Sequence, residues 1–147
     1  MSMTAYLLSD TARLLRRAFD GRMRLLGMTS AQARLLLNLA INEGENQGFY
    51  AERLEVEPIT LGRLVDRMVE SGLIERRPDP ADRRAWRIHL TDLSRQKIDE
   101  ARESLDGLEE QMLQGVTAPQ RENLAQLLET IRTNFAGGRS PGVAVNG

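Results

Sequence analysis

Two short strand-like stretches separated by a turn place the strongest constraint on how this chain can fold. Residues 73–77 are LIERR, and residues 86–90 are WRIHL, which alternates apolar and polar side chains at the two-residue period of a half-buried strand. Residues 78–85, PDPADRRA, combine turn-forming proline and aspartate with two adjacent arginines. The sequence therefore predicts a β-hairpin with a basic tip. Trp86 and Ile88 share one strand face and are expected in the core, whereas His89, on the other face, is expected at the surface.

A pair of short helices is expected directly before this hairpin. Residues 49–56 suit a short helix, and Pro58 stands where proline favours the first turn of a second helix, which ends at Ser71-Gly72. The apolar stripe of that second helix consists of Leu61, Leu64, Val65, Met68 and Val69. The same helix pair also occurs in αα-hairpins that do not bind DNA, but a basic-tipped hairpin immediately after it predicts a winged helix.

Two more helices are predicted nearer the N-terminus. Residues 6–26 carry apolar side chains at three- and four-residue intervals, which is typical of an amphipathic helix, and Gly27 fits its C-terminus. Thr29 fits the N-cap of a second helix that ends before Glu43, and residues 43–48 are expected to form a loop. The buried face of this second helix is predicted to consist of Ala33, Leu36, Leu37, Ala40 and Ile41.

The C-terminal third carries two apolar stripes. After Thr91, an N-cap candidate, residues spaced 3, 4, 3 and 4 apart form a coiled-coil-like seam that needs a partner: Ile98, Ala101, Leu105, Leu108 and Met112. After a new helix start at Thr117, a second stripe can pair with the first: Leu124, Leu127, Leu128, Ile131 and Phe135. Residues 136–147, rich in glycine and small residues, are predicted to be a disordered tail.

Composition excludes several classes of function. The 147 residues suit one domain, and no apolar run approaches the roughly 18 residues of a membrane span. No signal peptide is recognisable, so a cytoplasmic location and no membrane partner are expected. With no cysteine and one histidine, the chain lacks thiol redox chemistry and is an improbable zinc protein. It shows no nucleophile or general-base constellation, so we expect no enzyme activity, no catalytic or metal-binding residue and no cofactor.

The charge is unevenly distributed. The formal net charge is −1, and the positive charges come from 19 Arg and one Lys. Between residues 58 and 89 there are 7 Arg against 5 acidic residues, so this segment carries +2 and the remainder −3. The planar fork of arginine suits phosphate and guanine, although a codon bias also explains the abundance of arginine.

The order of these elements resembles the MarR family of bacterial transcription regulators, from about Leu7 to Phe135 and most strongly from Val56 to Thr91. The resemblance rests on a helix-turn-helix at Ala51–Ser71, a GLIER stretch at 72–76, the wing sequence DPADRRA at 79–85 and a Leu-Thr step at 90–91. It implies one mainly α domain at 1–135 with a small β-hairpin wing. That domain would comprise a winged helix-turn-helix lobe at about 29–91 and dimerisation helices at about 6–28 and 92–135, with about six helices per chain in a triangular homodimer.

This resemblance implies a sequence-specific DNA-binding regulator, expected to be a repressor that binds a pseudo-palindromic operator as a homodimer. It would then lie on the bacterial nucleoid when bound. Two recognition helices related by a two-fold axis enter successive major grooves about one helical turn apart, hence the approximate palindrome. The alternative is a winged-helix dimer that binds another protein instead of DNA, which the acidic balance and Glu57 favour.

Candidate DNA contacts lie on the exposed first turns of the second helix of the pair. They are Pro58, Ile59, Thr60, Gly62 and Arg63. Arg67, one turn further along, either contacts phosphate or pairs with Glu70 or Asp66. A glycine inside a helix costs about 0.8–1.0 kcal/mol relative to alanine, so Gly62 either lets DNA approach closely or is a tolerated defect.

In the wing, the resemblance implies that Arg84 enters the minor groove, that Arg83 contacts the DNA backbone, and that Asp82 braces the hairpin. A solvated hairpin tip is the alternative. The strand residues Arg76, Arg77 and Arg87 either reach phosphates or pair with Glu75 or Asp79.

Three residues depart from the family pattern. Glu55 replaces the usual turn glycine, Glu57 stands at the usual N-cap serine, and Ser94 replaces the glycine after the Leu-Thr step. A carboxylate at the start of a recognition helix repels phosphate unless it accepts a hydrogen bond from a cytosine amino group. The operator is therefore expected to differ from the commonest family type.

The family resemblance also implies a small organic effector, such as a phenolic or aromatic carboxylate or its coenzyme A thioester, because the composition excludes thiol oxidation and disfavours zinc. Such a ligand weakens operator binding by its differential affinity for one conformation. The candidate residues on the first helix are Arg13, Arg16, Arg17 and Phe19, with Arg13 the strongest candidate. A solvated helix face is the alternative interpretation of these arginines.

Overall fold

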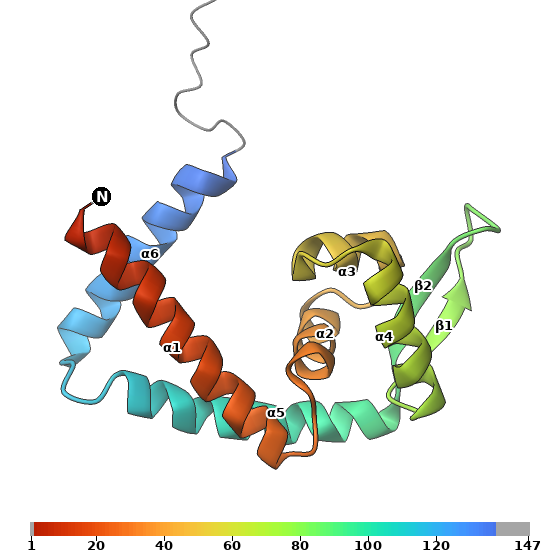
Figure 1. Cartoon of the computed structure of the whole chain (residues 1–147), viewed down its shortest axis with the longest axis horizontal. Helices are drawn as coiled ribbons and strands as arrows, with labels where there is room; N and C mark the ends of the chain where they lie inside the picture. The colour runs from red at the N-terminus through yellow and green to blue at the C-terminus, as the bar shows by residue number, and fades with distance from the viewer. Residues whose placement is uncertain (1, 138–147) are drawn as a thin grey trace, which may run out of the picture. The chain divides into compact units, whose positions relative to one another are not determined.

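The computed structural model of the chain describes residues 2–137, and these form six helices and one two-stranded antiparallel sheet (Figure 1). The elements are α1 (Met3–Leu25), α2 (Ser30–Ile41), α3 (Gln47–Leu54), α4 (Pro58–Glu70), β1 (Ile74–Pro78), β2 (Trp86–Leu90), α5 (Asp92–Met112) and α6 (Ala118–Ala136). This confirms the mainly α architecture with a hairpin wing. The chain divides into two compact units, one up to Glu109 and one from Glu110 onward.

Local capping explains where several helices begin. Thr29 and Thr117 each accept a hydrogen bond from the amide three residues later, and the glutamine at that position returns one to the N-cap amide. Such reciprocal bonds satisfy amides that the helix itself leaves unpaired. At the start of α1 the Ser2 side chain accepts from the Ala5 amide, so the helix begins at Met3, ahead of the predicted start at residue 6.

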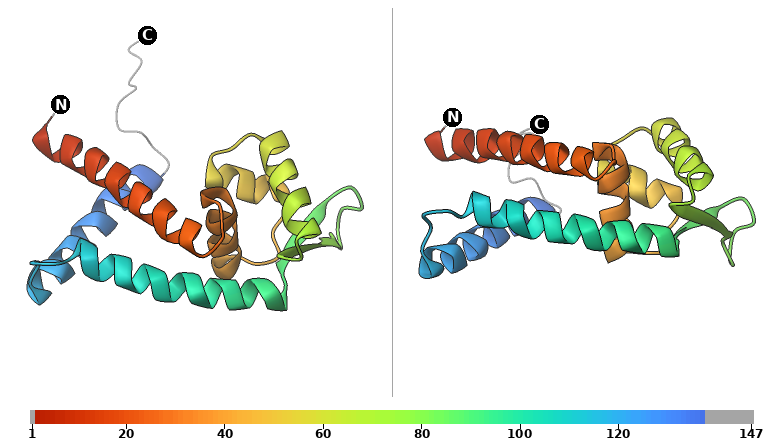
Figure 2. Two further views of the ribbon diagram at one scale, coloured as in Figure 1. Left: turned by 60° about the horizontal axis from the view of Figure 1, so that its bottom comes forward. Right: turned by 90° about the horizontal axis from the view of Figure 1, so that it is seen from below.

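The core of the first unit lies where α2, α3 and α4 pack with the hairpin (Figures 1 and 2). Four of the five predicted stripe residues of α4 are buried, and Val69, 36% exposed, lies at the edge. The predicted face of α2 was wrong in part. Leu35 and Leu39 are buried there while Ile41 is 79% exposed, because α2 contacts α1, α3, α4 and β2 and so buries a broader, rotated face.

The seam along α5, which was predicted to need a partner, is partly covered within the chain. Ile98 and Ala101 belong to the core of the first unit, and Leu108 is buried as well. Met112 is 45% exposed. In α6, by contrast, none of the described side chains is buried.

The hairpin pairs Ile74 with Leu90 at its base and Pro78 with Trp86 at its far end. Trp86 is 47% exposed, so its assignment to the core was wrong: it shares a face with the buried Ile88 but lies beyond the body of the unit. His89 is half-buried beside Gly44 and Glu43 rather than on the open surface.

Two further sequence predictions concern the chain ends and membranes. The predicted disordered tail lies outside the described residues except for Ala136 and Gly137, which close α6. Among the described residues, no helix combines the length and apolar character that crossing a membrane requires.

Candidate nucleic-acid interface

The first turn of α4 is exposed, whereas the face of the helix that packs against the other elements is buried. Residues 57–60 are all exposed, with Ile59 at 71%, whereas Leu61, Leu64 and Val65 bury the opposite face. Pro58 occupies the first turn of the helix, as predicted, and lacks the N–H that would be unpaired there. The buried stripe therefore anchors α4 while its first turn stays available for contact.

The turn between α3 and α4 contains a strained residue. Glu55 has φ of 54° in the left-handed region, which glycine adopts without strain but other residues do not. Its amide still closes α3 by donating to the Glu52 carbonyl, and Val56 donates to Ala51. The departure from the usual glycine thus keeps the turn geometry at a conformational cost.

Two predicted contact residues on α4 have open surroundings. A Cβ at Gly62 would meet only Nε2 of Gln47 at 3.9 Å, so packing within the described chain does not require glycine there. The Arg63 side chain is exposed and has no hydrogen-bond or ion-pair partner in the described residues. Arg67 donates a weak 3.4 Å bond to the Arg63 carbonyl, and Asp66 pairs with Arg76 instead.

Two aspartates shape the loop of the wing. Oδ1 of Asp79 accepts hydrogen bonds from the amides of Ala81 (2.8 Å) and Asp82 (3.3 Å), and its Oδ2 accepts one from Nε of Arg87 (3.1 Å). The Ala81 amide, followed by Arg87, holds the pKa of Asp79 below its usual range. Oδ1 of Asp82 accepts from the Arg84 amide at 2.9 Å, the geometry expected of a brace.

The bracing role of Asp79 was not predicted from the sequence, although an aspartate whose carboxylate accepts a bond from the amide two residues on is a common turn signal. The sequence also does not determine which wing arginines are engaged within the protein. Arg76 pairs with Asp66 and Gln47, Arg77 with Glu75, and Arg87 with Asp79.

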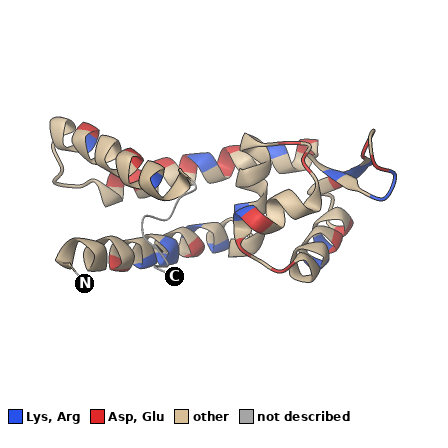
Figure 3. Ribbon diagram, turned by 90° about the horizontal axis from the view of Figure 1, so that it is seen from above, with Lys and Arg blue, Asp and Glu red and all other residues tan. Residues whose placement is uncertain are grey.

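Arg83 and Arg84, by contrast, are exposed at the tip, and their side chains have no partner in the described residues. Figure 3 shows basic residues on both strands and in the loop of the wing, with acidic residues beside them. The strand arginines are therefore committed to ion pairs, while the tip arginines and Arg63 are available to an external anion.

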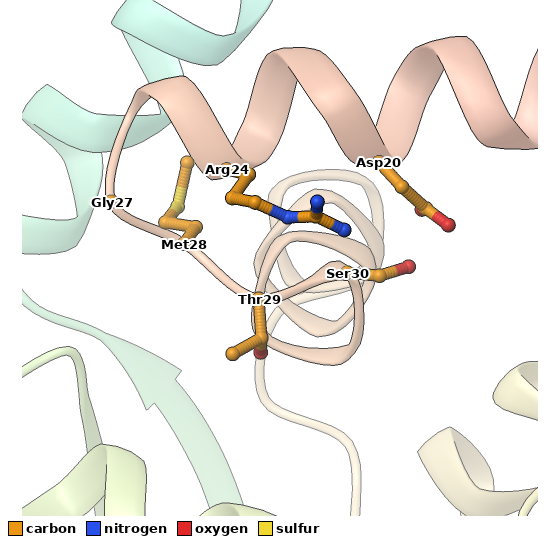
Figure 4. A pocket seen from close by; sticks show the side chains of 6 residues that line it. All are labelled: Asp20, Arg24, Gly27, Met28, Thr29 and Ser30. Carbon is orange, nitrogen blue, oxygen red and sulfur yellow. The ribbon is translucent and has the colours of Figure 1, made fainter.

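The four candidate effector residues lie on α1 in different surroundings. Arg13 forms a 2.8 Å ion pair with Asp10, Arg16 and Arg17 are exposed, and Phe19 packs partly against the core. An open cavity of about 450 Å³ lies at the junction of α1 and α2 (Figure 4). Its lining residues are Asp20, Arg24, Gly27, Met28, Thr29 and Ser30.

Comparison with known proteins agrees with this geometry. A family model described as the MarR family matches residues 26–85, which cover α2, α3, α4, β1 and the wing loop. Over this segment the chain is therefore similar to the MarR family. The family members it matches are transcription regulators rather than enzymes.

Solved MarR structures share the fold over nearly the whole chain. A MarR transcriptional regulator from Methanosarcina mazei Go1 matches with a TM-score of 0.81 and 22% identity over 91% of this chain and 96% of that one. A mutant MarR from E. coli in complex with operator DNA matches with a TM-score of 0.74 and 23% identity, over 86% of this chain and 91% of that one. The transcriptional repressor CouR, bound to a 23-mer DNA duplex, matches with a TM-score of 0.75 and 26% identity, over 87% of this chain and 91% of that one.

Proposed function

We propose that this protein is a homodimeric, sequence-specific DNA-binding repressor. The observation that carries the proposal is the division of its arginines: those on the strands are held in ion pairs, whereas Arg63, Arg83 and Arg84 extend unpaired from α4 and the wing tip. Arginine is the side chain best suited to phosphate and guanine. The DNA-bound structures of the E. coli protein and of CouR support the same use of this fold.

The contacts divide into two groups. The first turns of α4 would enter the major groove, where Pro58, Ile59, Thr60, Gly62 and Arg63 reach base edges and Arg67 reaches phosphate. The wing would lie along the adjacent backbone, with Arg83 on phosphate and Arg84 in the minor groove, while Asp82 holds the Arg84 amide in place.

Binding to labelled DNA from upstream of the protein's own gene, measured by fluorescence anisotropy, tests this function. We expect Arg84→Ala to weaken binding by about 1–3 kcal/mol and the parent's log affinity to fall steeply with log salt concentration. Arg102→Ala also removes an exposed arginine, but from α5, and is the control, expected to bind as the parent does. Absence of DNA binding even at low salt would favour the alternative, a winged-helix module that binds protein.

We propose that two copies of the chain form a homodimer. Large apolar side chains are exposed on α1 and α6, including Leu7, Leu14, Leu127 and Phe135. On each of these helices, exposed large apolar side chains are characteristic of an interaction surface. We expect a dimer by light scattering. Leu127→Asp should shift the protein toward monomer and weaken operator binding, whereas Gln126→Asp on the same helix should do neither.

A small organic acid is the proposed effector, and two positions fit it. Arg13, with Arg16, Arg17 and Phe19, is the first. The second is the cavity of Figure 4, whose volume suits a small ligand and whose Arg24 guanidinium can pair with a carboxylate. Salicylate can serve as the probe of operator release. Loss of release in Arg13→Ala alone selects the first position, loss in Arg24→Ala alone selects the second, and unchanged release in both removes both assignments.

A further inference from the structure

The start of α4 differs from every other helix start in residues 2–137. Five helices begin with a Ser, Thr or Asn whose side-chain oxygen accepts a hydrogen bond from the amide three residues later: Ser2, Thr29, Asn46, Thr91 and Thr117. Glu57 holds the same position on α4, with extended backbone angles of −63° and 145°, yet its carboxylate makes no capping bond. The Glu57 carbonyl still accepts the first helical bond, from the Leu61 amide, but the Glu57 side chain contributes nothing to capping α4.

Nothing else in the described chain engages this carboxylate. Glu57 is exposed and has neither a hydrogen-bond nor an ion-pair partner among residues 2–137. Two residues further along, Ile59 is 71% exposed, whereas the apolar stripe of the same helix is buried in the core. An unpaired negative charge and an exposed apolar side chain thus lie together on the turn that faces DNA in the proposed function.

Electrostatics restrict what this carboxylate can meet on DNA. Phosphates repel it, so it can approach the duplex only where a hydrogen-bond donor is available. In the major groove the donors are the N4 amino group of cytosine and the N6 amino group of adenine. Adenine presents the N7 acceptor beside its donor, which opposes a carboxylate, whereas the edge of cytosine presents only the donor. The apolar counterpart for isoleucine is the methyl group of thymine.

Resting on the proposed function, we propose that Glu57 is a specificity-determining residue that accepts a hydrogen bond from the N4 amino group of a cytosine in each half-site. Ile59 contacts the methyl group of a neighbouring thymine. The absence of a side-chain cap on α4 is the stability cost of this arrangement. A serine or threonine at position 57 would cap the helix but would not present a negatively charged acceptor to the base edge. The operator half-site accordingly carries a cytosine and a thymine under the first turn of α4.

Selection from a pool of random-sequence duplexes by the full-length protein tests this assignment without a known operator. The parent should enrich a palindromic motif with one strongly preferred cytosine in each half. Glu57→Ser should keep the rest of the motif but lose that preference by about tenfold, since one base contact distinguishes bases by roughly this factor. Glu57→Gln should shift the preference toward adenine, which pairs with an amide side chain. Ile59→Ala should relax selection only at the neighbouring thymine.

Glu70→Ser is the matched control, because it removes one exposed carboxylate from the last residue of the same helix. It should enrich the parent's motif unchanged. If Glu57→Ser enriches the same cytosine as the parent, or if the parent's motif has no cytosine that responds to residue 57, the inference is overturned while DNA binding stands. If the parent enriches no motif at all, the proposed function itself fails. A melting temperature for Glu57→Ser no lower than the parent's shows that any loss is not unfolding.

Discussion

The guanidinium of Arg22 on α1 donates a 2.9 Å hydrogen bond to the backbone carbonyl of Ser104 on α5. Directly beside it, a Cβ atom built at Gly107 would lie only 2.9 Å from Nη1 of Arg22. The arginine thus occupies the space that any other residue at position 107 would need. Gly107 lies inside a 21-residue helix, where glycine is unfavourable, and a larger residue there would have to displace the end of the Arg22 side chain.

Replacing this glycine should therefore affect stability differently in the parent and in a variant without the Arg22 guanidinium. In an Arg22→Met background, Gly107→Ala should stabilise the fold by about 1 kcal/mol through helix propensity. In the parent it should displace the guanidinium and lose a hydrogen bond from a charged donor, which offsets or exceeds that gain. Urea unfolding of the four proteins in the cycle measures the difference. Equal stabilisation in both backgrounds would show that Arg22 and Gly107 do not interact.

The left-handed conformation of Glu55 predicts a stabilising substitution. Glu55→Gly should raise the free energy of unfolding by about 1 kcal/mol, because the strain of a non-glycine residue at φ of 54° is relieved. Glu52→Gly, inside α3, is the control and should lower it by about the same amount. Thermal unfolding of both variants checks the signs, and a lower melting temperature for Glu55→Gly would contradict the assignment of strain.

The Glu43 carboxylate should make stability depend on pH in the acid range. Burial raises its pKa, but hydrogen bonds from the Leu90 amide and from Arg95, together with the charge of Arg95, outweigh that effect and lower the pKa overall. Because the folded pKa is lower than the unfolded value, the ionised group stabilises the fold above the unfolded pKa. That contribution is lost as the pH falls through the folded pKa.

Glu43→Gln should accordingly be less stable than the parent at pH 7, by up to about 1 kcal/mol, the upper range for an exposed ion pair. The difference should shrink below about pH 4.5. Glu100→Gln, at an exposed position without a partner, should follow the parent at every pH. Guanidinium unfolding across pH 3–8 supplies the measurement. A constant gap between Glu43→Gln and the parent would mean that Glu43 acts without its charge.

Removing the Asp79 brace should weaken DNA binding indirectly. Asp79→Ala releases the amides of Ala81 and Asp82 and the Arg87 side chain, so the wing tip should sample more conformations and bind DNA several-fold more weakly. Its salt dependence should match the parent's because no cation is removed, whereas Arg83→Ala should lower the slope of log affinity against log salt by about 1. An altered slope in Asp79→Ala would instead indicate a changed set of phosphate contacts.

Local chemistry along the sequence was sufficient to predict most of the elements. Thr29 and Thr117 followed three residues later by glutamine specify helix starts, and the alternation at 86–90 specifies β2, because caps and strand periods involve neighbours within a few residues. The wing sequence and the helix pair before it were enough to predict the MarR fold. The DNA contacts that they also predict stay a prediction.

What the tertiary structure decided are relationships between residues distant in the sequence. It paired Arg76 with Asp66 and left Arg84 free, and it exposed Trp86 while burying Leu35. It also placed Arg22 against Gly107, 85 positions along the chain. Periodicity alone cannot determine such outcomes, because the partner of a side chain depends on which other elements pack around it. The sequence by itself determined which elements form, and tertiary packing decided which of their charged side chains remain available to a partner.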